Sequence, residues 1–337
     1  VMYKRQLYTI AAMLLMAMLA RPAIHGQDGT RKSESPKNVI LMIGDGMGIS
    51  QLSAAYYFRD EKDAKREPAF NRFLHIGLCR TSPGVELVTQ SAAASTALAT
   101  GHKTYNMAIG VDLDTVVREN IVELLSRQGY MTGIIASSHI TDATPAGFYA
   151  HQPERYMFNE IAWDLLKSDI DFFAGGGSKF FMDSTGIYPF EEYNIELNTS
   201  KLKRIRKPEP GLRYGFLLGK ERMPTMYEGR GDFLAKASSI AMEFLSTGDK
   251  GYFLMVEGAQ IDWAGHANDA KYLVGEMLDF EQVIASALDF AEKDGSTLVV
   301  VTADHETGGF SLSAKLDEET GSRDYAEVGP DFATNSH

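Results

Sequence analysis

Four short runs of apolar residues constrain the fold of this chain more than any other feature. Each run is continuous, and together they cover residues 38–43, 131–136, 252–256 and 297–302. Apolar runs of this length are typical of strands buried on both faces, as in a parallel sheet. Helical spacing lies between them, over residues 119–127, 233–245 and 270–293. We therefore predict an α/β fold built on a doubly wound, mostly parallel sheet.

Acidic side chains follow three of these runs directly. Asp45 comes after the first run and Glu257 after the third, while the pair Asp304 and His305 follows the fourth. The carboxyl ends of parallel strands meet at one edge of a sheet, so these groups should converge there. Carboxylates gathered in one place repel each other unless cations lie between them. The pattern therefore predicts a site that holds more than one metal ion.

Asp45 lies inside a glycine turn, GDGMG, between a predicted strand and a helix that begins near Ser50. Strand, glycine turn and helix form the phosphate-binding arrangement of doubly wound folds. A dinucleotide site is one interpretation, but it requires G-x-G-x-x-G, and a carboxylate in the turn would repel a pyrophosphate. Asp45 as a metal ligand is the second interpretation, and Asp45 as a simple helix cap is the third.

A run of small residues from Thr89 to Gly101, TQSAAASTALATG, predicts a helix that begins near Ser91. Free N–H groups and the helix dipole favour an anion at such a position. The Ser91 hydroxyl is therefore a candidate nucleophile toward a phosphate or acyl group. The alternative is a helix of small residues that packs closely on the sheet, with Ser91 as an ordinary cap.

Two further stretches carry candidate ligands. Asp142, Thr144 and Arg155 follow the second predicted strand, where the Thr144 hydroxyl could bind Mg²⁺ and Arg155 could hold a phosphate through two hydrogen bonds. Arg155 as a surface ion-pair partner is the alternative. Asp262 and His266 are spaced four residues apart, which places both on one face of a helical turn and suits Zn²⁺.

Composition excludes several functions. The net charge of −12 leaves no basic surface that could bind nucleic acid by bulk electrostatics. Cys79 is the one cysteine of the chain, so an intrachain disulfide and a thiolate metal cluster are excluded. We predict a further strand over residues 75–80, which would place Cys79 in the core.

The N-terminus carries a basic region, with Lys4 and Arg5, followed by an apolar run over residues 7–20. This pattern predicts a secretory signal peptide over residues 1–26, and the run is too short for a comfortable membrane span. An uncleaved N-terminal anchor is the alternative. Residues 27–337 are then expected to form one catalytic domain, in which about 182–230 are an insertion or cap.

Five motifs, in order, resemble those of the alkaline phosphatases. They are IGDGMG at 43–48, TQSAAASTALATGHKTYN at 89–106, DATPAGFYAHQPER at 142–155, VEGAQIDWAGH at 256–266 and TADHETGG at 302–309. The resemblance covers about residues 38–337. It implies a three-layer α/β/α fold and a periplasmic or secreted enzyme that hydrolyses phosphate monoesters with two Zn²⁺ and one Mg²⁺. It implies no stable membrane span once the signal is cleaved, and a homodimer is one assembly that the sequence allows.

The resemblance also implies roles for individual residues. Ser91 matches the nucleophile that becomes phosphoserine, and Arg155 matches the arginine that binds the phosphate oxygens. Asp142 matches an acid next to the magnesium site. The zinc beside Ser91 would be bound by Asp45, Asp304 and His305. The other zinc would be bound by Asp262, His266 and His337. Magnesium would be bound by Thr144 and Glu257, and Asp45 would bridge to it.

Two departures from the family pattern matter. Gln90 precedes the nucleophile where the family commonly has Asp, so we expect weaker positioning of Arg155 and looser phosphate binding. The family's chains continue past the histidine that His337 matches, so we expect this chain to lack the C-terminal part of the fold. A phosphodiesterase or sulfatase of the same superfamily is the first alternative function, and a non-catalytic remnant that binds phosphate or metal is the second.

Overall fold

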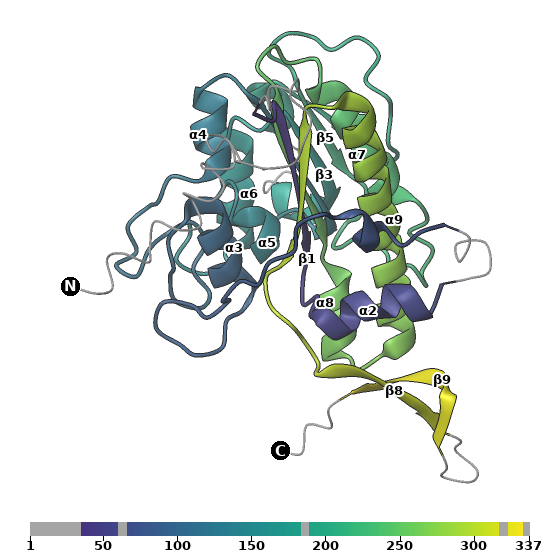
Figure 1. Ribbon diagram of the computed structural model, residues 1–337. Helices are drawn as coiled ribbons and strands as arrows, with labels where there is room; N and C mark the ends of the chain where they lie inside the picture. Colours follow the sequence, from purple (N-terminus) through teal and green to yellow (C-terminus); the bar gives the residue numbers. More distant parts are fainter. Residues whose placement is uncertain (1–34, 60–65, 183–188, 317–322, 333–337) are drawn as a thin grey trace.

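The structure is a computed structural model that describes residues 35–59, 66–182, 189–316 and 323–332 (Figure 1). Its centre is a seven-stranded sheet in the order β4-β5-β3-β2-β6-β1-β7, and all of its pairings are parallel. The strands are β1 (Asn38–Gly44), β2 (Met131–His139), β3 (Phe172–Gly176), β4 (Ile195–Asn198), β5 (Arg213–Leu217), β6 (Tyr252–Gly258) and β7 (Thr297–Ala303). The four apolar runs are therefore strands β1, β2, β6 and β7, as predicted, and they are neighbours in the sheet.

Helices cover both faces of this sheet, which confirms the doubly wound, three-layer α/β/α fold (Figure 1). One layer contains α3 (Ser91–Thr100), α4 (Ile121–Arg127), α5 (Ala143–Ala146) and α6 (Phe158–Lys167). The other contains α2 (Ile49–Tyr57), α7 (Phe233–Leu245), α8 (Gln260–His266) and α9 (Ala270–Asp294). Short 3₁₀ turns are η3 (Ala69–Arg72), η4 (Ser178–Phe181) and η5 (Pro189–Tyr193).

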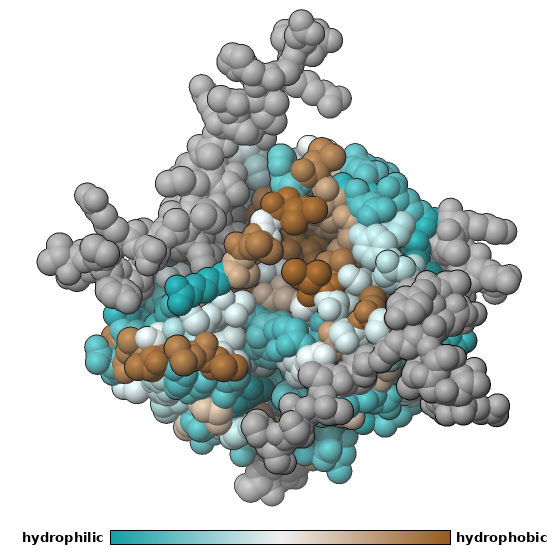
Figure 2. Space-filling view, turned by 60° about the horizontal axis from the view of Figure 1, so that its bottom comes forward, coloured by the Kyte–Doolittle hydropathy of each residue, from teal (hydrophilic) through white to brown (hydrophobic). Residues whose placement is uncertain are grey.

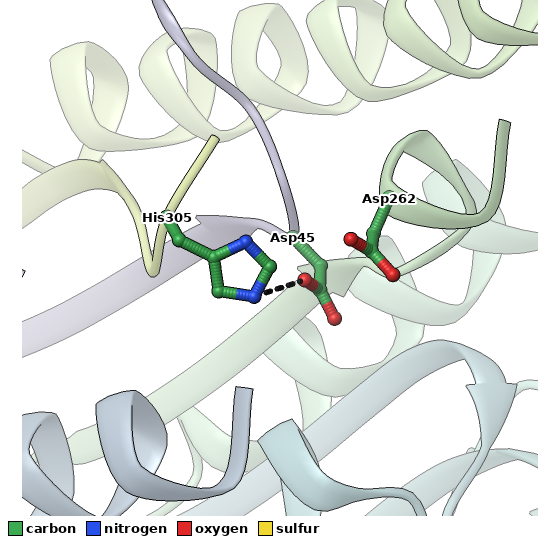
Figure 3. A group of neighbouring side chains, drawn as sticks. All are labelled: Asp45, Asp262 and His305. Carbon is green, nitrogen blue, oxygen red and sulfur yellow. Dashed lines mark ion pairs between the residues drawn. The ribbon is translucent and has the colours of Figure 1, made fainter. Parts of the chain in front are cut away.

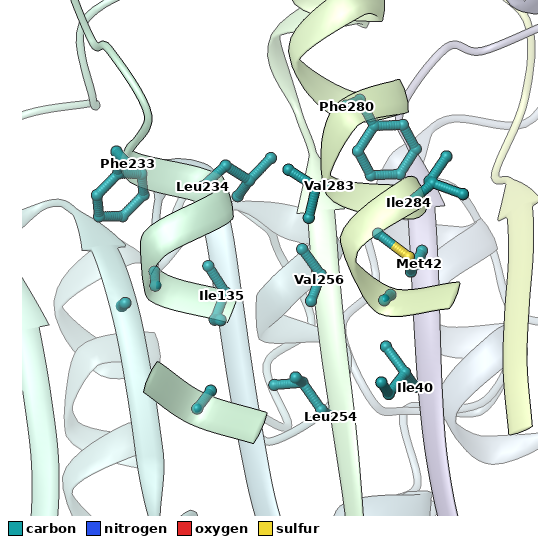
Figure 4. Close-up of a cluster of buried hydrophobic side chains, with 14 of the residues drawn as sticks. Ile40, Met42, Ile135, Phe233, Leu234, Leu254, Val256, Phe280, Val283 and Ile284 are labelled. Atoms are coloured by element: carbon teal, nitrogen blue, oxygen red, sulfur yellow. The ribbon is translucent and has the colours of Figure 1, made fainter. Parts of the chain in front are cut away.

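The two faces of β1 enter two separate cores, which explains its uninterrupted apolar sequence. Ile40 and Met42 pack toward α9, while Val39, Leu41 and Ile43 belong to the cluster on the opposite face. Figure 4 shows the first core, where α9 places Phe280, Val283 and Ile284 over β1 and β6. Full burial of one such side chain stabilises the fold by roughly 1.5–3 kcal/mol. The packed core holds the ends of the central strands in fixed register.

The strand predicted over residues 75–80 is wrong. The described residues 74–81 form no strand, Leu74 and Leu78 are 91% and 93% exposed, and Cys79 is exposed rather than in the core. Alternating apolar residues form a strand only when a partner strand pairs with them, and no described segment pairs with this one.

Exposed hydrophobic side chains gather in a hollowed area on the face seen in Figure 2.

The segment predicted to be an insertion or cap contributes β4 and β5 to one edge of the sheet. A separate two-stranded antiparallel sheet, β8 (Phe310–Leu316) and β9 (Arg323–Phe332), follows β7. The predicted signal peptide and His337 lie outside the described residues. Among the helices that are described, none has the length and apolar character needed to cross a membrane.

Candidate active site

The parallel register brings the ends of β6, β1 and β7 to one edge of the sheet. Ile43 on β1 pairs with Glu257 on β6 and with Thr302 on β7. Asp45 and Asp304, which follow β1 and β7, therefore lie close to each other, and the Gly46 N–H donates to Asp304 Oδ1 at 3.0 Å. The convergence inferred from the apolar runs is present in the structure.

Three side chains form a compact group of metal-ligand type at this edge (Figure 3). One ligand atom each of Asp45, Asp262 and His305 lies within 4.8 Å of the others. His305 Nε2 is 3.6 Å from Asp45 Oδ1 and 3.3 Å from Asp304 Oδ2. Asp262 comes from α8, so two loops and one helix bring these ligands together. His266 is also on α8 but lies at the rim, with a side chain that is 72% exposed and Nε2 3.5 Å from Asp262 Oδ1.

The electrostatics of the buried carboxylates indicate that cations belong here. Burial, and then the neighbouring charges of Asp304 and Asp262, raise the pKa of Asp45 well above its usual range. Burial, followed by the charge of Asp142, does the same to the pKa of Glu257. Two buried oxygens, Glu257 Oε1 and Asp304 Oδ2, accept no hydrogen bond from the described residues. Because a buried charge without a partner is costly, these atoms fit the ligand set of a metal centre.

Ser91 is the first residue of α3, and it faces this group. Its hydroxyl lies 3.5 Å from Asp45 Oδ1 and 3.4 Å from His305 Nε2. Gln90 is the extended residue that caps the helix start, and Ala94 N–H donates to its carbonyl. The N–H groups before Ala94 therefore lie at the free end of the helix, where an anion is favoured.

Small residues explain how α3 reaches this position. Ala92 and Ala93 are buried, and α3 packs closely against α5. A Cβ on Gly147, which follows α5, would lie 2.5 Å from the Ser95 hydroxyl. Bulkier residues would push α3 away from the sheet edge and carry Ser91 with it.

Arg155 reaches Ser91's end of α3 from the loop after α5. Its Nη1 donates to Gln90 Oε1 at 2.6 Å, and its Nη2 donates to Asp142 Oδ1 at 3.1 Å. Its Nε is buried and has no acceptor among the described residues. Burial opposes ionisation of Asp142, but the charges of His139 and Arg155 outweigh it and lower the pKa of this carboxyl. The Arg155 guanidinium is thus charged and oriented, and three of its five N–H groups, including the one on Nε, make no hydrogen bond to the described residues.

Thr144 lies on the far side of Asp45. Its hydroxyl is 3.5 Å from Asp45 Oδ2, and it lies on α5 two residues after Asp142, which caps that helix by accepting a 2.8 Å hydrogen bond from Ala143 N–H. Thr144 therefore lies near both Asp45 and Glu257, whose pKa it influences. Every sequence-predicted site residue among the described ones is at this edge of the sheet, with His266 at its periphery.

Sequence reasoning missed residues that hold the ligands in place. Thr307 donates to Asp262 Oδ1 at 2.5 Å and lies 3.1 Å from His305 Nδ1. Gln51, fully buried on α2, donates to the Thr307 carbonyl at 2.8 Å. Thr307 lies inside the TADHETGG motif, but its role there is not encoded in ligand spacing, and Gln51 lies outside all five motifs, so neither was singled out.

Comparisons with known proteins identify the family of this chain. The family model described as alkaline phosphatase matches residues 36–196 and 217–326. Alkaline phosphatase 3 of Bacillus subtilis is 41% identical over 292 residues, which are 82% of this chain and 63% of that protein. The alkaline phosphatase of Escherichia coli is 30% identical over 333 residues, covering 81% of this chain and 71% of its own length.

A solved structure agrees as well. The alkaline phosphatase of the Antarctic bacterium TAB5 superposes with a TM-score of 0.84 at 46% identity, over 89% of this chain and 87% of that one. A variant of the TAB5 enzyme is described with Mg bound in its M3 site. The chain spans less than two thirds of the length of Alkaline phosphatase 3 and Alkaline phosphatase 4 of Bacillus subtilis, 63% in each case. The family match covers most of the sequence, and the chain belongs to the alkaline phosphatase family.

Proposed function

We propose that the protein hydrolyses phosphate monoesters through a phosphoserine on Ser91. The observation that carries the proposal is the position of this hydroxyl. It begins a helix, lies 3.5 Å from Asp45 and 3.4 Å from His305, and follows Gln90, the residue to which Arg155 donates a hydrogen bond. Membership of the alkaline phosphatase family supports the same reaction.

The site would hold two Zn²⁺ and one Mg²⁺. One zinc would be held by Asp45, Asp304 and His305, the other by Asp262, His266 and His337, and magnesium by Asp45, Thr144 and Glu257. The buried oxygens of Glu257 and Asp304 that lack hydrogen bonds support this assignment. Metal ions in such a site supply positive charge that lowers the pKa of a nucleophile and stabilises the attacking and leaving oxygens.

The side chains of the protein perform the rest of the reaction. The Ser91 hydroxyl loses its proton and attacks phosphorus, the ester P–O bond breaks, and the leaving oxygen takes up one proton to leave as the alcohol. Water then loses a proton and attacks the phosphoserine, the P–O bond to Ser91 breaks, the Ser91 oxygen takes up a proton, and phosphate leaves. Arg155 and the free N–H groups at the start of α3 would hold the phosphoryl oxygens in both steps, because Arg155 is bonded to Gln90 at the same helix end that Ser91 begins.

We further propose that the polypeptide is exported. The predicted signal peptide, residues 1–26, supports a periplasmic or secreted location, and residues 27–337 would form one catalytic domain in which 182–230 is an insertion that includes strands β4 and β5 of the central sheet. The proposed substrates are small phosphate monoesters, and a homodimer is the proposed assembly. Gel filtration and N-terminal sequencing of the secreted protein would test assembly and signal cleavage.

The activity is tested by a panel of three nitrophenyl esters. We expect turnover of the phosphate monoester to exceed that of the phosphate diester and the sulfate by several orders of magnitude, because Arg155 and the helix start suit a dianion. If the diester or the sulfate is turned over faster than the phosphate monoester, the protein is instead a phosphodiesterase or sulfatase of the same superfamily. No turnover of any ester after incubation with Zn²⁺ and Mg²⁺ would favour a non-catalytic remnant.

A further inference from the structure

The hydroxyl of Thr307 links two side chains of the metal-ligand group. Thr307 lies in the loop between β7 and β8, and it is 7% exposed. Its Oγ1 is 2.5 Å from Asp262 Oδ1 and 3.1 Å from His305 Nδ1. His305 Nδ1 is also 3.2 Å from the carbonyl oxygen of Glu306.

The acceptors around these atoms fix the proton positions. A carbonyl oxygen only accepts, so the contact with Glu306 requires a proton on His305 Nδ1. An ionised carboxylate also only accepts, so the Thr307 hydroxyl donates its proton to Asp262. The Thr307 lone pair then accepts from His305. The chain of hydrogen bonds runs in one direction, from His305 through Thr307 to Asp262.

The direction of these hydrogen bonds determines which nitrogen of His305 has a lone pair available for a metal ion. With Nδ1 protonated, a neutral imidazole carries its lone pair on Nε2. Nε2 is the atom that faces Asp45 at 3.6 Å, Asp304 at 3.3 Å and the Ser91 hydroxyl at 3.4 Å. The ligand atom of His305 thus points into the acidic edge of the sheet.

We propose that Thr307 is a positioning residue that orients the imidazole ring of His305, whose tautomer the Glu306 carbonyl sets, and the carboxylate of Asp262, and so joins the ligands of two different zinc ions through one hydroxyl. The inference rests on the proposed function, because it takes His305 and Asp262 as ligands of separate zinc ions. It predicts that the two sites lose affinity together when the hydroxyl is removed. Groups that orient ligands in this way typically contribute about 10–100-fold to metal affinity.

The surroundings hold Thr307 in this position. A Cβ on Gly46 would lie 2.9 Å from the Thr307 hydroxyl, and a Cβ on Gly265 of α8 would lie 2.8 Å from its carbonyl oxygen. Gln51 donates to the same carbonyl. The loop can approach the Asp45 turn and α8 this closely because both neighbours are glycines, and the close packing leaves the Thr307 side chain little freedom.

The test compares two substitutions by their zinc affinity. Thr307→Val keeps the shape of the side chain and removes the hydroxyl, whereas Thr307→Ser keeps the hydroxyl and removes a methyl group. The metal-free full chain is titrated with Zn²⁺ in competition with a chromophoric chelator, and Co²⁺ spectra report the ligand geometry. We expect Thr307→Val to bind zinc about 10–100-fold more weakly at both sites, with altered Co²⁺ bands. Thr307→Ser should bind within about threefold of the parental chain, because the hydroxyl is the group that matters.

Thr225→Val is the matched control. Thr225 is also 7% exposed, and its hydrogen bonds go to Glu228 and Arg230 rather than to a candidate metal ligand. This variant should lose stability without losing zinc affinity. Unchanged zinc binding in Thr307→Val, or equal weakening in Thr307→Val and Thr307→Ser, would overturn the inference. A parental chain that binds zinc but hydrolyses no ester would contradict the proposed function alone, whereas a parental chain that binds no zinc would overturn both.

Discussion

Arg155 Nη1 donates a 2.6 Å hydrogen bond to Oε1 of Gln90, the residue before the candidate nucleophile. A neutral amide therefore orients the guanidinium where the family commonly has a carboxylate. A hydrogen bond to a charged acceptor is roughly twice as strong as one to a neutral acceptor. The affinity for phosphate should therefore depend on whether residue 90 carries a charge.

Gln90→Asp should bind inorganic phosphate more tightly than the parental chain. The carboxylate would hold Arg155 more firmly, and we expect the inhibition constant of phosphate to fall about tenfold, or ~1.4 kcal/mol. Gln90→Asn, which has the size of Asp without its charge, is the control and should not show this gain. If phosphate binds no tighter to Gln90→Asp, Gln90 does not set the affinity.

Arg155→Lys should lower kcat/KM for a nitrophenyl phosphate about 100-fold, or ~2.7 kcal/mol, because an ammonium cannot offer the planar pair of donors. Steady-state kinetics measure this loss. Arg127→Lys changes an exposed ion pair with Glu119 on the surface and is the matched control. Equal kinetics in both variants would remove Arg155 from the phosphate site.

Glu257→Gln should abolish stimulation by added Mg²⁺ while zinc content, measured by elemental analysis, stays unchanged. The reason is the buried Glu257 Oε1, which has no hydrogen-bond partner among the described residues and would be a magnesium ligand.

The same variant has a second expected property. In the metal-free protein, burial holds the pKa of Glu257 well above its ordinary value, so an ionised carboxylate destabilises the fold at pH 8. Metal-free Glu257→Gln should therefore resist urea better than the metal-free parental chain at pH 8. Lower resistance would show that the carboxylate is stabilising without a cation, contrary to the account of the site.

Asp171 gives a pH dependence that does not involve the active site. It accepts from Thr132 N–H at 2.8 Å, and burial raises its pKa to about 6. The folded state then binds the proton more tightly than the unfolded state. Its ionisation costs nothing below about pH 4, costs progressively more between pH 4 and 6, and has its full cost above pH 6.

Asp171→Asn should remove this cost. Relative to the parental chain, its free energy of unfolding should rise by roughly 1–2 kcal/mol between pH 4.5 and pH 7.5, measured by urea denaturation with a chelator present. Asp249→Asn, at an exposed position, should track the parental chain at both pH values. If the difference in free energy of unfolding between Asp171→Asn and the parental chain is the same at both pH values, Asp171 is not the source of this pH dependence.

The apolar runs predicted β1, β2 and β6 because both faces of those strands are buried, and such burial requires apolar residues throughout the strand. The fourth run, β7, is also a strand, but it lies at the edge of the sheet and is half-buried rather than buried. The same runs located Asp45, Glu257, Asp304 and His305, since a residue that follows a parallel strand has little choice of where to lie. Local pattern alone carried these predictions.

The failures have a different cause. The apolar alternation over residues 75–80 satisfied the local rule for a strand, but pairing is a long-range property that the alternation does not encode. Thr307 was missed because its role depends on the approach of α8 to the loop after β7. The exposed position of His266 at the rim also depends on how α8 is placed, which its spacing from Asp262 does not determine.

The central claim is that Ser91 carries the phosphoryl group, and phosphoenzyme trapping tests it most directly. Radiolabelled phosphate is incubated with the protein at acid pH, the mixture is quenched, and the labelled peptide is sequenced. We expect label on Ser91 in the parental chain and in Ser95→Ala, a substitution one turn further along the same helix, and no label in Ser91→Ala. Label that persists in Ser91→Ala, or that lies on another residue of the parental chain, would contradict this claim.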